Sequence, residues 1–421
     1  MAQTLKFGNK VWAAKEDSVL AYNDINNNYK PLPFDFARAS IGTRVNKDGL
    51  IETMGQNIPR IDYTDSADGV LLLEPSSTNL VTYSEAFDNA YWTKSGVSVT
   101  SGFISPDGTS NAFKLVEDTS NAKHRVFTNA IGTSRAFSFF AKADGRTWVS
   151  VLSNNGNSSF FDIGNGVVGT VAGGSIGKIE PIGNNGWYRC TLYNSHGTFG
   201  AYVGLAKSDN LETYIGDGTS GALIYGAQLE ALSYATSYIP TSGSSVTRAA
   251  ETCNNSGNSE VFNDSEGVLF ADIAALANDG TNRVLSLSNG SYSNSIRIQY
   301  YTVSNQLEFR VVSSNSAVVL QRVTINNVTL FNKILVKYKL NDFAMWVNGF
   351  ELITDTNGAT PVGLDEIRYD DGDGNVPFYG KTKELGYYNT ALTDAELETL
   401  TSYRNWVSMV NELNLNIIYN G

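Results

Sequence analysis

Apolar and polar side chains alternate in short runs along most of this chain, and turn-forming residues separate the runs. Between residues 71 and 251 the runs are rich in aromatic and β-branched residues and end at turns such as Pro106-Asp107-Gly108 and Asn184-Asn185-Gly186. An apolar period of two, interrupted by Gly, Pro, Asn and Asp, is typical of β-strands. Residues 135 to 142 are apolar on both faces, so we expect this strand to be covered on both sides. The pattern predicts a β-sandwich, in which a second sheet provides the cover.

A second series of strand-like runs follows a polar connector at residues 242 to 264, which is rich in Ser, Asn and Gly and has no apolar period. Such a segment is typical of a domain boundary. The strands predicted after it lie at residues 267–273, 282–287, 295–301, 306–313, 318–323 and 334–340. A hairpin is predicted at Phe343–Val347 and Phe350–Ile353, because Asn348-Gly349 between them is a preferred pair in type I′ turns. The pattern predicts a second β-sandwich over residues 252 to 421.

The first 70 residues are predicted to form an extended arm. Residues 23 to 28 are a polar run with little to bury. Pro31 and Pro33 favour extended backbone at their own positions and at the residue before each. Two roles fit such a segment, an anchor or oligomerisation strand on the one hand and a plain linker on the other.

One short helix is predicted near the C-terminus, where Thr393 is a favourable N-cap and Glu396 completes a capping box. Beyond it, apolar and polar residues alternate from 412 to 419, which predicts a closing strand or a contact with a partner chain. The fold class predicted for the whole chain is therefore all-β. It consists of an extended arm at residues 1–70 and two consecutive jelly-roll sandwiches at residues 71–251 and 252–421.

Composition narrows the classes of function. The net charge is -12, and an acidic surface repels nucleic-acid phosphates and anionic lipid headgroups. No apolar run approaches the roughly 20 residues that span a bilayer, and the first ten residues lack the apolar core of a secretory signal. We therefore expect no nucleic-acid partner, no membrane insertion and synthesis in a cytoplasm.

Cysteine and histidine are scarce. Cys190 lies in a strand-like run and is expected to be buried, whereas Cys253 lies in the polar connector and is expected to be exposed. Neither predicts a disulfide framework. Only His124 and His196 are present, which excludes zinc catalysis, and both are interpreted as surface or structural residues.

No catalytic group is predicted. Residues 173 to 177 match the G-x-S-x-G pattern, but the residues that follow do not begin a helix, as a nucleophile elbow requires. No strand carries two alternating carboxylates suited to glycoside hydrolysis. The chain is therefore predicted not to be an enzyme, although two carboxylates that are distant in sequence and meet in the fold would leave a depolymerase open.

Two kinds of binding site are predicted. Glycan sites on β-sandwiches stack sugar rings on aromatic faces and bind the hydroxyls with nearby polar groups. The candidates for such a site are Trp148, Trp187, Tyr188, Tyr202, Gln228 and Glu230. Core packing is the alternative for the aromatic residues, and a structural closing strand is the alternative for the other two.

Asp371, Asp373 and Asn375 place oxygen ligands at alternate positions, as calcium prefers, although a solvated turn also explains them. No cofactor is required, and calcium is the one considered.

Several segments of the first sandwich resemble a module of bacteriophage structural proteins. The closing segments are Gly226–Glu230, Ala235–Thr241 and Val246–Glu251, and the opening ones are Leu71–Pro75 and Thr78–Leu80. The second sandwich is similar to the concanavalin or laminin-G-like lectin fold. This looser similarity lies at Trp346–Gly349 and Gly386–Asn389.

The phage resemblance implies a jelly roll similar to carbohydrate-binding modules, displayed on a virion fibre, spike or head decoration. It implies a location on the virion surface, a homotrimer, contacts with other virion proteins through the N-terminal arm, and weak multivalent adhesion to cell-surface glycans. A tail-associated polysaccharide depolymerase and a purely structural fibre or capsid protein are the alternatives. Head and tail locations both stay open.

Overall fold

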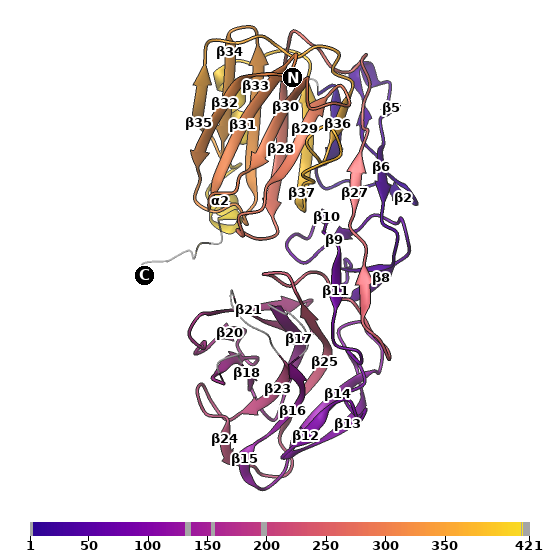
Figure 1. The fold of residues 1–421 in the computed structure, drawn as a ribbon, viewed down its shortest axis with the longest axis vertical. Coiled ribbons are helices and arrows are strands. Elements are labelled where there is room, and N and C mark those ends of the chain that lie inside the picture. Colours follow the sequence, from indigo (N-terminus) through magenta and orange to yellow (C-terminus); the bar gives the residue numbers. More distant parts are fainter. Residues whose placement is uncertain (1–2, 131–135, 153–155, 195–199, 414, 416–421) are drawn as a thin grey trace.

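The computed structural model describes residues 3–130, 136–152, 156–194, 200–413 and 415, and the chain is nearly all β (Figure 1). Two β-sandwiches lie one above the other along the long axis of the molecule, and the N-terminal residues run beside them (Figure 1). The predicted all-β fold with β-sandwich domains is confirmed.

The first sandwich consists of two six-stranded antiparallel sheets. One sheet has the order β12 (Thr93–Ser95), β16 (Arg125–Ala130), β23 (Gly200–Ala206), β18 (Trp148–Leu152), β19 (Ser158–Asp162) and β20 (Val167–Val168). The other has the order β13 (Val97–Phe103), β14 (Ala112–Glu117), β25 (Gly221–Glu230), β17 (Ala136–Asp144), β22 (Trp187–Asn194) and β21 (Ser175–Ile182). Two short pairs accompany them, β11 (Ser77–Asn79) with β26 (Val246–Arg248), and β15 (Asn121–Lys123) with β24 (Thr213–Ile215).

Strand β17 is covered on both faces, as its sequence predicts, while residue 135 at its predicted start lies outside the described residues. Phe137 and Phe139 belong to the core between the two sheets. Phe140 lies in a separate apolar cluster with Ile51, a residue of the N-terminal region. The outer cover is therefore not a second sheet of the same sandwich but a hairpin from another part of the chain.

The second sandwich packs a five-stranded sheet on a ten-stranded one. The smaller sheet has the order β32 (Ser316–Thr324), β31 (Gln306–Ser313), β30 (Ser295–Tyr300), β29 (Arg283–Ser288) and β36 (Glu366–Arg368). The main path of the larger sheet is β35 (Phe350–Asp355), β34 (Asp342–Val347), β33 (Asn332–Lys339), β28 (Glu266–Ala275), β37 (Gly380–Tyr388), β1 (Leu5–Gly8), β4 (Tyr22–Asn23) and β5 (Lys30–Pro31). Its other two strands are β10 (Val70–Leu73), which pairs with β37, and β9 (Ile61–Asp62).

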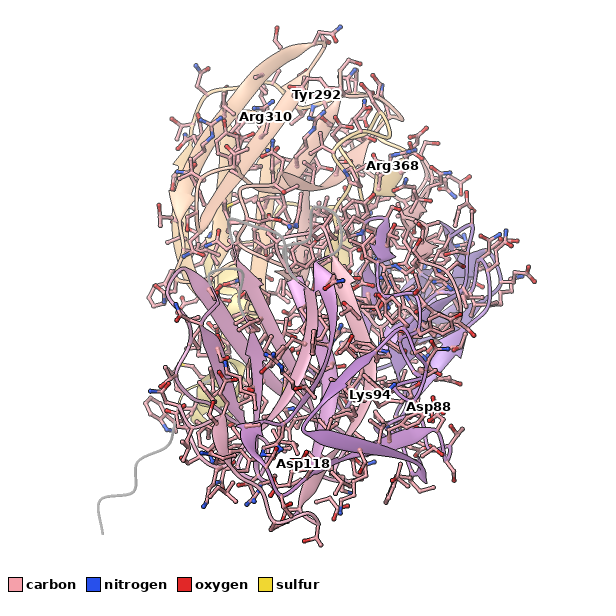
Figure 2. The ribbon with its side chains drawn as sticks, turned by 60° about the horizontal axis from the view of Figure 1, so that its bottom comes forward. Asp88, Lys94, Asp118, Tyr292, Arg310 and Arg368 are labelled. Atoms are coloured by element: carbon pink, nitrogen blue, oxygen red, sulfur yellow. The ribbon has the colours of Figure 1, made fainter. Side chains whose placement is uncertain are left out.

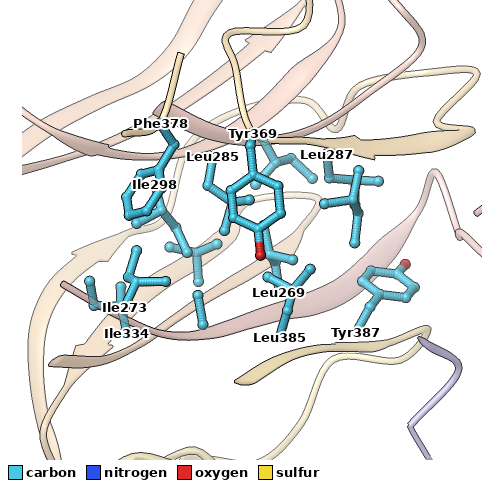
Figure 3. Packing of buried hydrophobic residues seen from close by; sticks show 14 of the residues in the cluster. Leu269, Ile273, Leu285, Leu287, Ile298, Ile334, Tyr369, Phe378, Leu385 and Tyr387 are labelled. Atoms are coloured by element: carbon cyan, nitrogen blue, oxygen red, sulfur yellow. The ribbon is translucent and has the colours of Figure 1, made fainter. Parts of the chain in front are cut away.

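The core between these sheets is built from the inward-facing residues of alternating strands (Figure 3). Leu269 and Ile273 of β28 face Leu285 and Leu287 of β29 across the gap, and Tyr369 lies among them (Figure 3). The predicted hairpin is present as β34 and β35. Asn348 and Gly349 have φ values of 51° and 90°, which is the left-handed backbone that a type I′ turn requires.

The N-terminal segment is extended, but it runs along the second sandwich instead of standing apart as an arm. Strand β1 pairs antiparallel with β37. Phe7 and Phe34 are buried in the core of the second sandwich. The remaining strands of this region are β2 (Ala14–Lys15), β3 (Ser18–Val19), β6 (Phe34–Ala37), β7 (Gly42–Val45) and β8 (Ile51–Met54), with a 3-10 turn at Ile25–Asn27. These strands are too short to show a period, so the sequence did not reveal their partners.

The burial of the two cysteines and of His124 can be compared with the predictions from the sequence. Cys253 is fully buried in β27 (Thr252–Asn254), opposite Phe36, so the prediction that it is exposed is wrong. Cys190 is buried, as predicted, and burial raises the pKa of both free thiols. His124 is buried between the carbonyl oxygens of Gly96 (2.7 Å) and Tyr214 (3.1 Å), a structural role. His196 lies outside the described residues.

Two short helices follow the last strand. Helix α1 (Asp394–Thr401) begins with the predicted capping box of Thr393 and Glu396. It packs Leu397 onto the outer face of the ten-stranded sheet, against Phe270 and Trp346. Helix α2 (Trp406–Glu412) was not predicted from the sequence. The predicted strand at 412–419 lies largely outside the described residues. No helix among the described residues is long and apolar enough to cross a membrane.

A buried ionic cluster lies where the chain enters and leaves the first sandwich. Glu74 directly follows β10, and Glu251 directly precedes β27. Arg60 binds both carboxylates, with Nη1 2.8 Å from Glu74 and Nε 2.8 Å from Glu251. Arg38 lies 2.7 Å from Glu251, and Arg248 lies 3.0 Å from Glu74. All five side chains are at most 3% exposed. Burial raises the pKa of Glu74, but Arg248 and Arg60 outweigh it and hold this pKa below its ordinary value.

Glu251→Gln should destabilise the chain by about 3–5 kcal/mol, because Arg38 and Arg60 would stay buried without their carboxylate. Urea unfolding followed by tryptophan fluorescence measures this change. The control is Glu266→Gln, which removes an exposed ion pair with Lys339 and should cost no more than about 1 kcal/mol. Equal losses for the two variants would contradict the role given to the cluster.

Candidate functional site

Four of the six predicted glycan-binding residues are buried. Trp187 is 1% exposed and Tyr202 is 3% exposed, while Gln228 and Glu230 are fully buried. A side chain with no accessible surface cannot stack on a sugar ring or bind its hydroxyls. The prediction that these four residues form a glycan site is therefore corrected, because both faces of the strands that carry them are covered.

The other two predicted aromatic residues, Trp148 and Tyr188, are half-buried, and a glycine backbone lies against each ring. A Cβ atom on Gly169 would lie 2.6 Å from the ring of Trp148, and a Cβ atom on Gly166 would lie 2.6 Å from the ring of Tyr188. The backbone around β20 thus lies against both rings. The structure does not bring the six residues together into one open aromatic platform.

Gln228 and Glu230 instead hold the closing motif in place. The Gln228 side chain donates to Glu230 (2.7 Å) and accepts from the backbone N–H of Ile239 (2.6 Å). Glu230 accepts from the hydroxyls of Ser77 (2.6 Å) and Thr236 (2.5 Å). Their shared position on one strand, from which the sequence predicted sugar recognition, serves internal hydrogen bonding.

In the predicted calcium loop, backbone N–H groups donate hydrogen bonds to the carboxylates of Asp371 and Asp373. Asp371 accepts from the backbone N–H groups of Asp373 (3.2 Å) and Asn375 (3.0 Å), and Asp373 accepts from that of Tyr292 (2.5 Å). Within the ranges that the structure describes, no group of three or more His, Cys, Asp or Glu residues is placed to hold a metal ion. The loop has the geometry of a solvated turn, which was the alternative interpretation.

Tyr292, which donates to Asp373 through its backbone, accepts a hydrogen bond from Arg310 through its hydroxyl (2.6 Å). Both residues lie at the outer end of the second sandwich (Figure 2).

A cleft of about 540 Å³ lies on the ten-stranded sheet, next to the C-terminal helices. Its lining comes from residues 3–10 around β1, residues 66–69, the sheet strands, and residues 399–408. We call it the carboxylate cleft, after Asp272 and Glu384. Its volume is within the range of ~300–1,000 Å³ that is usual for sites of small ligands.

One register row builds the polar part of the carboxylate cleft. Gly8 of β1 lies opposite Glu384 of β37, which lies opposite Asp272 of β28, which lies opposite Lys333 of β33. Directly opposite residues in antiparallel strands have Cβ atoms ~5 Å apart and point to the same face. The two carboxylates are therefore neighbours, with a lysine on one side and a glycine without a side chain on the other.

The environment of Glu384 favours its neutral form. Burial and the negative charge of Asp272 raise the pKa of Glu384 to about 7, although Arg404, Lys333 and a hydrogen bond with Gln3 oppose the shift. Asp272 is 5% exposed and shares this low-dielectric surrounding. Near pH 7, protonated and ionised Glu384 are therefore present in similar amounts. When protonated, its carboxyl group both donates and accepts hydrogen bonds.

The sequence did not reveal this pair, because its members are far apart along the chain and meet only through the pairing of β28 with β37. Asp272 interrupts the apolar run Val268–Ala275, whereas Glu384 follows the polar residues Thr382 and Lys383 and has no such context. A charged residue within an otherwise buried strand was a signal that sequence reasoning had available.

Comparisons with known proteins give distant likenesses only. No protein-family model matches the chain, and no curated protein matches its sequence. Among solved structures, the CBM40 module of the Ruminococcus gnavus IT-sialidase, bound to α2,3 sialyllactose, is 14% identical, with 35% of this chain and 92% of that one covered at a TM-score of 0.30. Domain 4 of AbnA, an extracellular GH43 arabinanase of Geobacillus stearothermophilus in complex with arabinotriose, is 14% identical, with coverages of 36% and 73% and a TM-score of 0.30.

The NanB sialidase of Streptococcus pneumoniae is also similar, at 16% identity, with 33% of this chain and 24% of the sialidase covered and a TM-score of 0.29. The similar structures thus include carbohydrate-binding modules. Likenesses at these TM-scores transfer no function to this chain.

Glu384→Gln should change how stability depends on pH. A glutamate in the unfolded chain has a pKa of about 4.3, and the folded pKa is about 7. The folded chain therefore loses stability as the pH rises from about 4 to 7, and the full cost is present above pH 7. The variant cannot ionise, so at pH 8 it should be more stable than the parent by up to about 3 kcal/mol.

That difference should fade below pH 5, which urea unfolding at a series of pH values will show. Glu351→Gln, an exposed change on the same sheet, is the matched control. If the Glu384→Gln difference is as large at pH 5 as at pH 8, the assigned titration is wrong.

Proposed function

We propose that this chain is a non-enzymatic glycan-binding protein and that the carboxylate cleft of its second sandwich receives the glycan. The observation that carries the proposal is the row of Glu384, Asp272 and Lys333 in a cleft of about 540 Å³. Carboxylates accept hydrogen bonds from sugar hydroxyls, and a lysine or a protonated glutamate donates to their oxygens. Alternating donors and acceptors along one row match a ligand that carries hydroxyls on successive carbons.

Stacking in this site would come from the rim, because the aromatic residues of the floor are covered. Phe270 and Tyr388 line the cleft but are each 4% exposed. Among the tryptophans that the structure describes, Trp406 alone is mostly exposed, at 67%. It lies between Arg404 and Ser408, which both line the cleft. The Trp406 ring is not part of the cleft lining, so a sugar ring would stack on it only if the ligand extends beyond the cleft.

Lys333→Gln should weaken glycan binding about 10- to 100-fold, because Lys333 is the half-buried charged donor of the row and a hydrogen bond to a charged group contributes ~1.5–3 kcal/mol. The measurement is isothermal titration with an oligosaccharide first identified on a glycan array at high protein density. Glu351→Gln is again the control and should leave the affinity unchanged. Equal affinities of Lys333→Gln and the parent would remove the carboxylate cleft from the proposal, and a blank array would favour a purely structural role.

Glycoside hydrolysis is the second candidate function, and the paired carboxyl groups favour it specifically. A glycosidase needs one carboxyl group that is protonated near neutral pH and a second that is ionised. Glu384, with a pKa of about 7, meets the first requirement, and Asp272 is the carboxyl group directly opposite it. In that case Glu384 acts as the general acid and Asp272 as the nucleophile or base. Reducing ends released by the parent protein, and absent with Glu384→Gln, would establish hydrolysis.

Display on a bacteriophage virion belongs to the same proposal and rests on the resemblance of the segments around Gly226–Glu251 to phage structural modules. In this setting the chain is a homotrimeric fibre or head decoration in contact with other virion proteins, and many copies make weak glycan contacts strong. Immunogold labelling of purified virions tests the location, and light scattering tests the trimer. Label confined to the cell lysate, or a monomer, would contradict the respective statement.

A further inference from the structure

We infer that the ligand of the carboxylate cleft is a carboxylated sugar, and that Lys383 and Arg404 receive its carboxylate. The inference deepens the proposed function and rests on it. Three features support it: the excess of basic residues in the cleft, the contacts that position the lysines, and the protonation of Glu384.

The cleft is basic on a chain that is acidic. Five basic residues line it and only three acidic ones, whereas the whole chain has 30 basic and 42 acidic residues. The basic residues are Lys6, Lys10, Lys333, Lys383 and Arg404, and the acidic ones are Asp68, Asp272 and Glu384. A local excess of positive charge against a negative background attracts an anionic group to this place on the surface.

Two of the five basic residues are already neutralised at the rim. Lys6 lies 2.7 Å from Asp24, and Lys10 lies 3.1 Å from Asp68. A third, Lys333, lies opposite Asp272 in the register row. Among the side chains that the structure describes, a set that leaves out Glu412, no carboxylate forms an ion pair with Lys383 or Arg404. These two cations are the ones that a bound carboxylate would pair with.

Aromatic rings, not carboxylates, hold two of the lysines in place. The Nζ atom of Lys383 lies 4.1 Å from the ring centroid of Phe331, and that of Lys333 lies 5.1 Å from the ring centroid of Tyr403. Lys333 also donates to the backbone oxygen of Ser402 (3.3 Å). A cation–π contact orients an ammonium group without cancelling its charge. Lys383 is therefore positioned and still available to an anion.

The neighbouring carboxyl groups permit an anion to bind. Glu384 faces Asp272, Lys333, Arg404 and Gln3, and its pKa is about 7. Below pH 7 Glu384 is mostly uncharged, so at most one group of the pair is ionised. A carboxylated ligand then meets three cations and at most one anion in the inner cleft. Binding should therefore tighten as the pH falls from 8 to 6, whereas a neutral sugar would show little change.

The experiment compares oligomers of polygalacturonate, alginate and hyaluronan with the same oligomers after reduction of their carboxylates to alcohols. Affinities are measured by titration with the full chain at pH 6 and pH 8. We expect the acidic form of at least one pair to bind about tenfold more tightly at pH 6, as one charge-assisted contact provides. Lys383→Gln and Arg404→Gln should each remove most of that preference, which the ratio of the acidic-form affinity to the reduced-form affinity of each variant measures.

Lys339→Gln is the matched control, because Lys339 is an exposed cation on the same sheet and outside the cleft. Equal binding of the acidic and reduced forms would overturn the inference and leave glycan binding standing. Preferential binding of an acidic form that both variants retain would overturn the assignment of Lys383 and Arg404. Binding of neither form in any pair would overturn the proposed function together with the inference.

Discussion

Glu74 and Glu251 are buried with three arginines at the place where the chain enters and leaves the first sandwich. Burying five charges is tolerated only when each is paired and hydrogen-bonded, so the backbone around them has little freedom. The backbone N–H of Glu251 donates to the carbonyl of Glu74 (3.1 Å), and that of Glu74 donates to the Glu251 carboxylate (2.9 Å). Entry and exit strands are therefore fixed side by side, and Arg38 and Arg60 bring the N-terminal region to the same point.

The rest of the architecture follows from that fixed point. The N-terminal hairpin of β7 and β8 covers the outer face of the first sandwich through Ile51 and Phe140. The residues before it run along the second sandwich, where β1 extends the sheet beside β37. An ion pair between Lys381 of the second sandwich and Asp65 of the N-terminal region adds a further tie. The carboxylate cleft depends on this arrangement, because residues 3–10 and 66–69 form one of its sides.

The chemistry of the cleft rests on a balance of charges. Two carboxyl groups on adjacent strands repel each other, and burial adds to the cost of ionising both. One of them, Glu384, therefore keeps its proton close to neutral pH. The same feature suits recognition of an anionic sugar and acid catalysis of glycoside cleavage, which is why the two functional candidates share residues. They differ in outcome, since only hydrolysis releases new reducing ends.

The amino-acid sequence by itself determined the local features: the strands from their period of two, the β34–β35 turn from Asn348-Gly349, and the start of α1 from Thr393 and Glu396. Each depends on residues a few positions apart, where backbone preference and side-chain spacing act directly. Only the tertiary structure decided which faces are exposed. It buried Cys253, Gln228 and Glu230. It also brought Asp272 opposite Glu384, because strand pairing between distant segments sets burial and neighbours, and no local pattern in the chain encodes that pairing.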